Sequence, residues 1–346
     1  MNKIPEGELT VRKVLVFSIY LIFFGITASG QEFIWKAGNF GFFDNREYFN
    51  NYVQPQTMFG SQIFGEAGFK VDKQSSFSAG TNFLYEMGSN PSAKNAKLIL
   101  YYKYQTENFK LLLGSFARAR LYKLHPVLEH DTFQYYRPLH EGIFMEGRKS
   151  WGSQSLWLDW TSRQTETDRE TFLIGGTGIL NPGNWFLRYD GLMYHHAGTA
   201  AHDTNDHIRD NGGLVFMGGY DFTSLTDFDT LVISTGITGS YDRLRNVYDL
   251  DIRLGNLWEL YAIYKGFGIK SNLYWGEGQT QMVGDGMYKA KFYDRTDLVW
   301  EFLRKGPVRG EVMFSLHFLP EVVDYSQSLT VYLDINGHKK LNKLQQ

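Results

Sequence analysis

From residue 32 onward, apolar and polar side chains alternate along the chain with a period of two. In residues 76–88, for example, Phe77 and Phe83 lie on one parity, whereas Ser76 and Asn82 lie on the other. Successive side chains of a β-strand point to opposite faces of the sheet. The alternation therefore predicts strands that have one apolar face and one polar face.

Segments with this pattern recur along the whole chain, and sixteen of them can be counted. Their approximate spans are residues 32–42, 58–71, 75–88, 96–106, 109–121, 141–149, 154–164, 169–180, 184–196, 212–221, 229–241, 248–264, 267–279, 291–303, 307–319 and 326–337. Transmembrane barrels have an even number of antiparallel strands in bacterial single-chain proteins. We therefore expect an all-β, transmembrane antiparallel up-and-down β-barrel of about 16 strands, with roughly 14 to 18 as the range that uncertain strand ends allow.

The connections between these segments form two sets that alternate along the chain. One set is mostly short and comprises residues 72–74, 107–108, 150–153, 181–183, 265–266 and 304–307. The other set contains the long connections, at residues 43–57, 122–140, 197–211 and 280–290. Short periplasmic turns and long extracellular loops produce this asymmetry in outer-membrane barrels, whereas a soluble β-sandwich has no reason to follow it.

The N-terminus has the pattern of a secretory leader. Lys3, Arg12 and Lys13 precede a continuous apolar stretch over residues 14–26, and small residues follow up to Gly30. This stretch is shorter than the roughly 20 apolar residues that a transmembrane helix needs. We expect a signal peptide over residues 1–30 that is cleaved after about Gly30, a barrel over residues 31–337 and a periplasmic tail over residues 338–346. The expected location is the bacterial outer membrane, with its lipids around the barrel.

Composition narrows the chemistry. The chain has no cysteine, which excludes disulfides, thiolate metal sites and cysteine nucleophiles. Its aromatic content of 16% and its 36 Gly against 8 Pro favour strands joined by tight turns. The formal net charge of −2 does not resemble a nucleic-acid-binding surface, so no nucleic-acid partner is expected.

Charged side chains on the polar parity are candidates for lining a lumen. They are Lys97, Lys103, Lys110, Arg118, Arg120, Glu146, Arg148, Asp159, Arg188, Asp190, Asp251, Arg253, Glu259, Arg295, Asp297, Glu301, Arg309 and Glu311. Opposed charges across a narrow wet pore would order water and select polar solutes. The alternative is that these side chains pair along the wall and satisfy one another in a filled interior. Both interpretations stay open.

Two loops hold further candidate residues. The segment at residues 122–140 would either fold inward and narrow the channel or cover the outer mouth, and the cover is the simpler expectation. The region from His195 to His207 is rich in metal-ligand types. Their spacing matches no recognised zinc pattern, so we expect a solvated loop, no metal and no cofactor.

No linear catalytic motif occurs in the sequence. There is no Gly-x-Ser-x-Gly elbow and no His-Glu-x-x-His pair, and Gly175, Gly176 and Gly178 lie within a strand pattern. We therefore expect that the protein is not an enzyme. Barrel enzymes can nevertheless assemble sites from distant strands, so a rim hydrolase that uses His195, His196 and His317 with nearby aspartates stays as an alternative.

Four segments resemble a group of uncharacterised, porin-like outer-membrane barrels common in Bacteroidota. They are residues 42–48, 56–60, 265–270 and 293–298. The resemblance implies architecture and location, and it spans most of the mature chain. The chain ends in Leu-Gln-Gln instead of the terminal aromatic residue usual in proteobacterial barrels.

These observations lead to one expected function and two alternatives. We expect a channel through which small polar solutes diffuse. The first alternative is a closed barrel that binds an outer-membrane lipoprotein or another barrel as a scaffolding subunit. The second alternative is the rim hydrolase.

Overall fold

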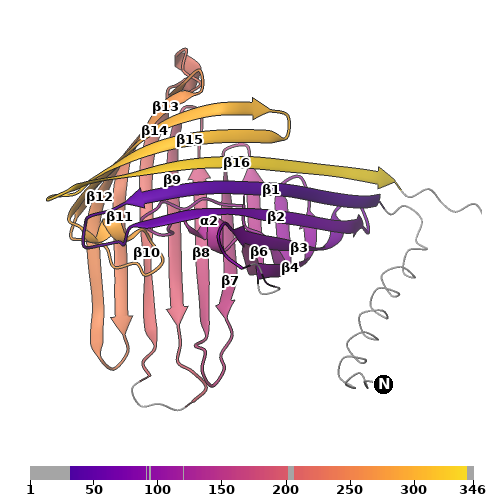
Figure 1. Ribbon diagram of the computed structural model, residues 1–346, viewed down its shortest axis with the longest axis horizontal. Helices are drawn as coiled ribbons and strands as arrows, with labels where there is room; N and C mark the ends of the chain where they lie inside the picture. The colour runs from indigo at the N-terminus through magenta and orange to yellow at the C-terminus, as the bar shows by residue number, and fades with distance from the viewer. Residues whose placement is uncertain (1–31, 91, 93–94, 120, 202–205, 341–346) are drawn as a thin grey trace, which may run out of the picture.

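The computed structural model describes residues 32–90, 92, 95–119, 121–201 and 206–340. Sixteen strands in this part form one closed antiparallel barrel, in which each strand pairs with its neighbours in the sequence (Figure 1). The strands are β1 (Glu32–Glu47), β2 (Gln56–Lys70), β3 (Ser75–Glu86), β4 (Ala96–Gln105), β5 (Phe109–Ala117), β6 (Leu139–Lys149), β7 (Gly152–Ser162), β8 (Thr171–Leu180), β9 (Trp185–His196), β10 (Arg209–Asp221), β11 (Thr230–Leu244), β12 (Tyr248–Tyr264), β13 (Phe267–Gly276), β14 (Phe292–Lys305), β15 (Val308–Phe318) and β16 (Val323–Lys340). The described connections contain the short helices α2 (Phe133–Tyr136), η3 (Thr223–Leu225) and η4 (Gly286–Lys289). The predicted barrel is confirmed, and each predicted segment coincides with one strand.

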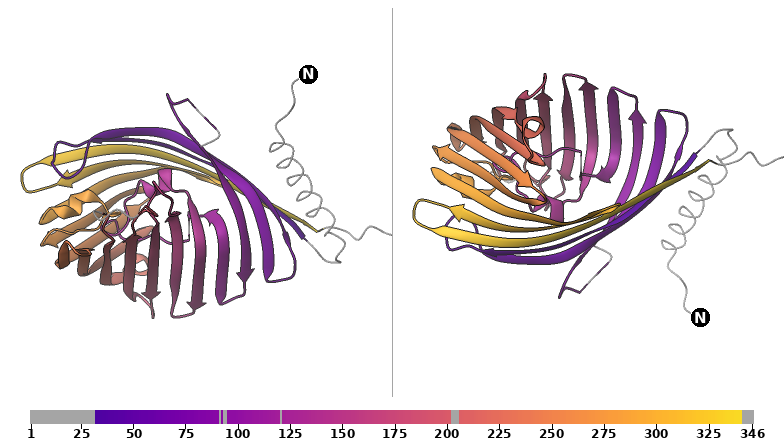
Figure 2. Two further views of the ribbon diagram at one scale, coloured as in Figure 1. Left: turned by 90° about the horizontal axis from the view of Figure 1, so that it is seen from below. Right: turned by 90° about the horizontal axis from the view of Figure 1, so that it is seen from above.

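Pairing of the first and last strands closes the sheet. β1 and β16 are in register from Glu32 opposite Lys340 to Glu47 opposite Tyr325. Figure 2 shows the yellow β16 beside the indigo β1 in both views. A closed sheet leaves no unpaired backbone edge, which is the condition for placing strands in hydrocarbon.

The two ends of the barrel differ in their connections. One end, called the turn end, carries the connections at residues 71–74, 106–108, 150–151, 181–184, 222–229, 265–266 and 306–307. The other, called the loop end, carries those at residues 48–55, 87–95, 118–138, 163–170, 197–208, 245–247, 277–291 and 319–322. All four predicted long loops lie at the loop end, so the predicted asymmetry is confirmed.

The two parities of each strand face outward and inward as predicted. Leu98 on β4 is 66% exposed and Ile252 on β12 is 58% exposed, and both lie on the apolar outer wall. Ser76, Ser78 and Asn82 on β3 are buried on the inner side. The outer wall therefore offers an apolar surface to lipid.

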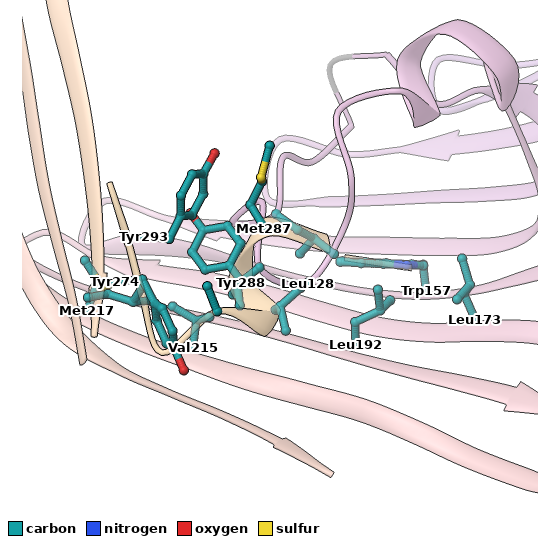
Figure 3. Packing of buried hydrophobic residues seen from close by; sticks show 14 of the residues in the cluster. Leu128, Trp157, Leu173, Leu192, Val215, Met217, Tyr274, Met287, Tyr288 and Tyr293 are labelled. Atoms are coloured by element: carbon teal, nitrogen blue, oxygen red, sulfur yellow. The ribbon is translucent and has the colours of Figure 1, made fainter. Parts of the chain in front are cut away.

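The barrel interior is less polar than the sequence analysis predicts. An apolar cluster fills its loop-end half, and Phe144, Trp157 and Leu173 contribute to it from the inward parity of three neighbouring strands. Figure 3 shows Trp157 and Leu173 within this cluster. Residues of four connections, including Leu128 and Tyr288, complete the cluster. The expectation of a polar interior is therefore wrong for this half of the barrel.

Two of these loop-end connections supply most of the loop residues in the cluster, because they fold into the barrel. We call residues 118–138 the inner segment and residues 277–291 the second inner segment. The backbone N–H of His130 donates to the carbonyl of Val283 at 2.8 Å, and that of Asp285 donates to the carbonyl of Pro126 at 2.9 Å. The simpler expectation for residues 122–140, a cover over the outer mouth, is wrong, because Val127 and Leu128 are buried inside the wall.

The predicted signal peptide lies outside the described residues, as do residues 341–346. β16 continues to Lys340, so residues 338–340 belong to the last strand and not to a separate tail. Within the described ranges, no helix combines the length and the apolar character that crossing a bilayer would require.

Candidate functional site

An ion-pair network fixes the inner segment to the barrel wall. Asp131 accepts from Arg46 of β1 at 2.7 Å and from Arg295 of β14 at 3.2 Å. Arg46 also pairs with Asp44 at 2.7 Å, and Arg295 pairs with Asp297 at 2.8 Å. Burial opposes ionisation of Asp131, but Arg46 and its other cationic neighbours outweigh burial and hold its pKa well below the usual range. The carboxylate therefore stays charged between β1 and β14, which only β16 and β15 separate in the closed sheet.

A second network holds the beginning of the inner segment against β7. The Arg118 guanidinium forms an ion pair with Asp159 and another with Glu129 at 3.0 Å, and it donates to the hydroxyl of Tyr122. It also donates to the carbonyl of Arg137 at 3.1 Å. Burial raises the pKa of Glu129, and Arg118 partly opposes that rise. Arg118 thus joins both ends of the inner segment to the wall.

His125 lies at the deepest part of the inner segment. Its Nε2 is 3.5 Å from Glu259 of β12, and its backbone N–H donates to Asp190 of β9 at 3.3 Å. Arg188 lies between these carboxylates, at 3.2 Å from Glu259 and 3.4 Å from Asp190. Burial lowers the pKa of His125 to about 4, so its imidazole is neutral at pH 7.

Most of the predicted lumen residues form pairs on their own wall. Glu146 contacts Arg148 at 2.7 Å and Lys110 at 3.9 Å, and Asp251 contacts Arg253 at 2.9 Å. Further contacts join Lys270 to Glu311 at 3.7 Å, Arg304 to Glu301 at 3.3 Å and Lys97 to the carbonyl of Tyr136 at 3.5 Å. Lys103 and Arg309 have no ion pair with a described residue, and Arg120 lies outside the described residues. Many of the charged side chains that face the interior therefore pair with one another along the wall, as one of the two interpretations expects.

A different group of side chains lies on the outer wall near the loop end. Five residues stand directly opposite one another across neighbouring strands, and we call them the outer-wall row. They are Trp160 of β7, Phe172 of β8, His195 of β9, Asp210 of β10 and Arg243 of β11. They share the outward parity of the exposed Ile174, Leu187 and Leu214. His196, one residue on, has the inward parity.

Contacts along the outer-wall row orient its histidine. The Phe172 ring stacks on Trp160 and on the His195 ring, at centroid distances of 5.2 and 4.7 Å. His195 Nδ1 is 3.4 Å from Asp210 Oδ1. Arg245 donates to both oxygens of Asp210, at 2.7 and 3.0 Å. Among the described residues, Nε2 of His195 has no hydrogen-bond partner, which is the arrangement that a general base toward water requires.

The histidine region does not assemble a metal site in the part of the chain that the structure describes. No group of three His, Asp or Glu side chains there could hold an ion. His195 and His196 point to opposite sides of the wall, which separates the two nearest candidates. His202 and Asp203 lie outside the described residues.

A protein-family model described as "Lipid A 3'-O-deacylase-type" matches residues 27–343. The chain belongs to this family. The prediction that this deacylase-type protein is not an enzyme is therefore wrong, because the family description is that of a deacylase. The narrower resemblance to Bacteroidota barrels stays a prediction. No curated protein sequence matches the chain.

Solved structures show the fold of the deacylase-type barrel. A loop L8 deletion mutant of OmpT, an outer membrane protein of Vibrio cholerae, aligns with a TM-score of 0.55 and 9% identity, over 88% of this chain and 99% of that chain. The anion-selective porin from Comamonas acidovorans aligns with a TM-score of 0.52 and 7% identity, over 88% and 99% of the two chains. At these identities the likeness concerns the architecture alone, which is that of outer-membrane barrels.

The sequence of the deacylase-type protein indicates His195 and His196 as candidates but gives no sign of Asp210 and Arg245. The predicted tenth strand began at residue 212, whereas β10 begins at Arg209. Asp210 therefore falls in a predicted loop, whereas the structure places it opposite His195. If the alternation of Leu214 and Phe216 is continued by four residues toward the N-terminus, Asp210 falls on the outer wall.

Proposed function

We propose that this protein is an outer-membrane hydrolase that cleaves an ester bond of a lipid in the outer leaflet, at the outer-wall row. The observation that carries the proposal is the contact between His195 and Asp210 on the lipid-facing side of the wall. The family description supports an ester-linked acyl chain of lipid A as the substrate. The closed barrel with an apolar outer wall supports the location, with the loop end directed outward.

The position of the outer-wall row suits an interfacial ester. Aromatic side chains such as Trp160 and Phe172 are typical of the level where hydrocarbon meets headgroups in barrels. Apolar residues, including Leu214 and Phe216, continue the same outward face toward the middle of β10. Acyl chains would lie along this apolar surface, while the glycolipid headgroup would reach the exposed Arg243 and Arg245.

The chemistry follows from the histidine and its carboxylate. A water molecule attacks the ester carbonyl and gives its proton to Nε2 of His195, while Asp210 stabilises the imidazolium that forms. Arg243 and Arg245 supply positive charge for the oxyanion of the tetrahedral intermediate. Collapse of the intermediate breaks the bond to the alcohol oxygen, and the proton on His195 passes to that oxygen. The products are a fatty acid and a lipid with one free hydroxyl.

The matched variants His195→Ala and His196→Ala test the proposal. Loss of the general base should lower the rate of deacylation by about 10²- to 10⁴-fold. His196→Ala should keep the wild-type rate, because that side chain points into the barrel. The measurement is mass spectrometry of lipid A incubated with the purified proteins in detergent. Wild-type activity in His195→Ala would reject the outer-wall site, and a wild-type protein that removes no acyl chain would reject the hydrolase.

Passage of small polar solutes is the second candidate. Charged side chains on the turn-end half of the interior, such as Lys103, Lys110 and Glu311, favour a wet vestibule. The inner segment and the second inner segment fill the other half, so passage would require their displacement. Planar-bilayer recordings check this candidate. Discrete conductance steps in the wild type would support it, and silence at every voltage would count against it.

A further inference from the structure

A cavity of about 480 Å³ opens at the turn end, on the inner side of β2, β3 and β4. It lies far along the strands from the outer-wall row, which is at the loop end. Lys70, Ser76 and Lys103 contribute to its lining, and Asp72, Lys73 and Glu107 lie in the turns around it. None of these residues takes part in the proposed hydrolysis.

The register of three strands sets a serine between two lysines. Ser76 of β3 stands directly opposite Lys70 of β2 on one side and opposite Lys103 of β4 on the other. All three have the inward parity. Directly opposite residues of antiparallel strands have Cβ atoms about 5 Å apart, so the hydroxyl and the two ammonium groups can reach one shared ligand.

The serine hydroxyl lacks a partner. Ser76 is 2% exposed, and its Oγ makes no hydrogen bond to any described residue. A buried hydroxyl without a hydrogen bond costs about 1–3 kcal/mol, so such a group in a folded protein points to a ligand that satisfies it. Ser76 is one of the residues that line the cavity, so a ligand bound there lies close to this buried hydroxyl.

The local charges favour an anion at this hydroxyl. Lys103 has no ion pair within the described chain, and the charged groups that act on it are Lys70, Lys36 and one carboxylate, Glu66. Lys70 is partly neutralised by Glu32 at 2.8 Å. Asp72 is engaged in its own turn, where it accepts the backbone N–H groups of Gln74 and Ser75 at 2.7 Å each. Glu107, in the next turn, also lines the cavity, but the three lysines of the lining outnumber its two carboxylates, Asp72 and Glu107.

We propose that Lys70, Ser76 and Lys103 form a binding site for a phosphate-type oxyanion at the turn end of the barrel. Several acceptor oxygens on one small anion match one hydroxyl donor and two ammonium groups, and lysine binds phosphate as a point charge. The phosphate group belongs either to a soluble molecule that enters the barrel from the turn end or to a phospholipid headgroup beside the mouth.

Isothermal titration calorimetry with inorganic phosphate tests the site on the whole mature protein. Lys103→Gln should raise the Kd for phosphate by about tenfold, because it removes a charge-assisted hydrogen bond. Ser76→Ala should raise it by about threefold to fivefold and leave the thermal midpoint without phosphate unchanged or higher. Lys97→Gln is the matched control, since Lys97 lies on the same face of β4 outside the cavity, and its Kd should equal that of the wild type.

Equal Kd values for Lys103→Gln and Lys97→Gln would overturn the proposal, as would a wild-type protein that shows no saturation up to ~10 mM phosphate. A second arm distinguishes the two sources. The titration is repeated in nanodiscs of phosphatidylcholine with and without phosphatidylglycerol. Weaker phosphate binding with phosphatidylglycerol would assign the site to a headgroup, and an unchanged Kd would assign it to a soluble phosphate.

Discussion

Replacing Arg118 by leucine should release the inner segment and accelerate amide exchange within it by about 10²- to 10³-fold. The Arg118 side chain is only 7% exposed and pairs with Asp159 and Glu129, which are themselves enclosed. Removing one partner of a buried ion pair leaves an uncompensated charge and costs about 3–5 kcal/mol. Native-state hydrogen exchange at the amides of Leu128 and Tyr135 measures the release, because both donate within the inner segment.

Arg148→Leu is the matched control for Arg118→Leu. The Arg148 side chain also pairs with an inward carboxylate, Glu146 at 2.7 Å, but it is 65% exposed. Exposed ion pairs contribute about 0–1 kcal/mol, so exchange in the inner segment should change by less than about fivefold. An equal effect of the two variants, or no effect of Arg118→Leu, would contradict the role of Arg118 in holding the inner segment. Conductance that appears only in Arg118→Leu would identify the inner segment as the barrier to solutes.

Acidification should also loosen the inner segment, through His125. Its pKa is about 4 in the folded barrel because of burial, against about 6.5 for an exposed histidine. Between these values the released segment binds more protons than the packed one, so the packed state loses stability as the pH falls from about 6.5 to about 4. The loss is about 3 kcal/mol when it is complete, and the stability is fully regained above pH 6.5.

The variant His125→Gln isolates this effect. Glu129, whose raised pKa stabilises the packed state on protonation, acts in the opposite direction and is present in both proteins. Exchange at Leu128, corrected for the intrinsic pH dependence of amide exchange, should rise on going from pH 7 to pH 4.5 in the wild type and rise much less in the variant. The same pH response in both would show that His125 is not the group responsible.

The barrel could be predicted from the sequence because its cause is local. Each strand shows its two faces in its own alternation, as Leu98 and Leu100 do against Lys97 and Lys103, and the packing of distant elements does not alter that pattern. The predicted strand ends are less accurate, because a strand ends where its backbone pairing ends and not where the alternation of apolar and polar residues ends. β10 and β16 each begin three residues before the predicted start.

The interior could not be predicted in the same way. The inward folding of residues 118–138 depends on Arg46 and Arg295. Arg46 precedes the inner segment in the sequence and Arg295 follows it, and both meet Asp131 only in the closed barrel. The inward parity did contain a signal, because Phe144 and Trp157 are large apolar residues at positions that a wet pore would fill with polar ones. The proposed hydrolase site has no linear motif, because His195 and Asp210 come from separate strands.

The position of Asp131 between Arg46 and Arg295 has a consequence for assembly. β1 is made early and β14 late, and the two cations come together only when nearly the whole sheet has closed. An incomplete sheet would leave this carboxylate with one counter-ion at most and the apolar residues around it in contact with water. We therefore expect the interior to order last during insertion. An ordered core would then be present only in barrels whose sheet is completely closed.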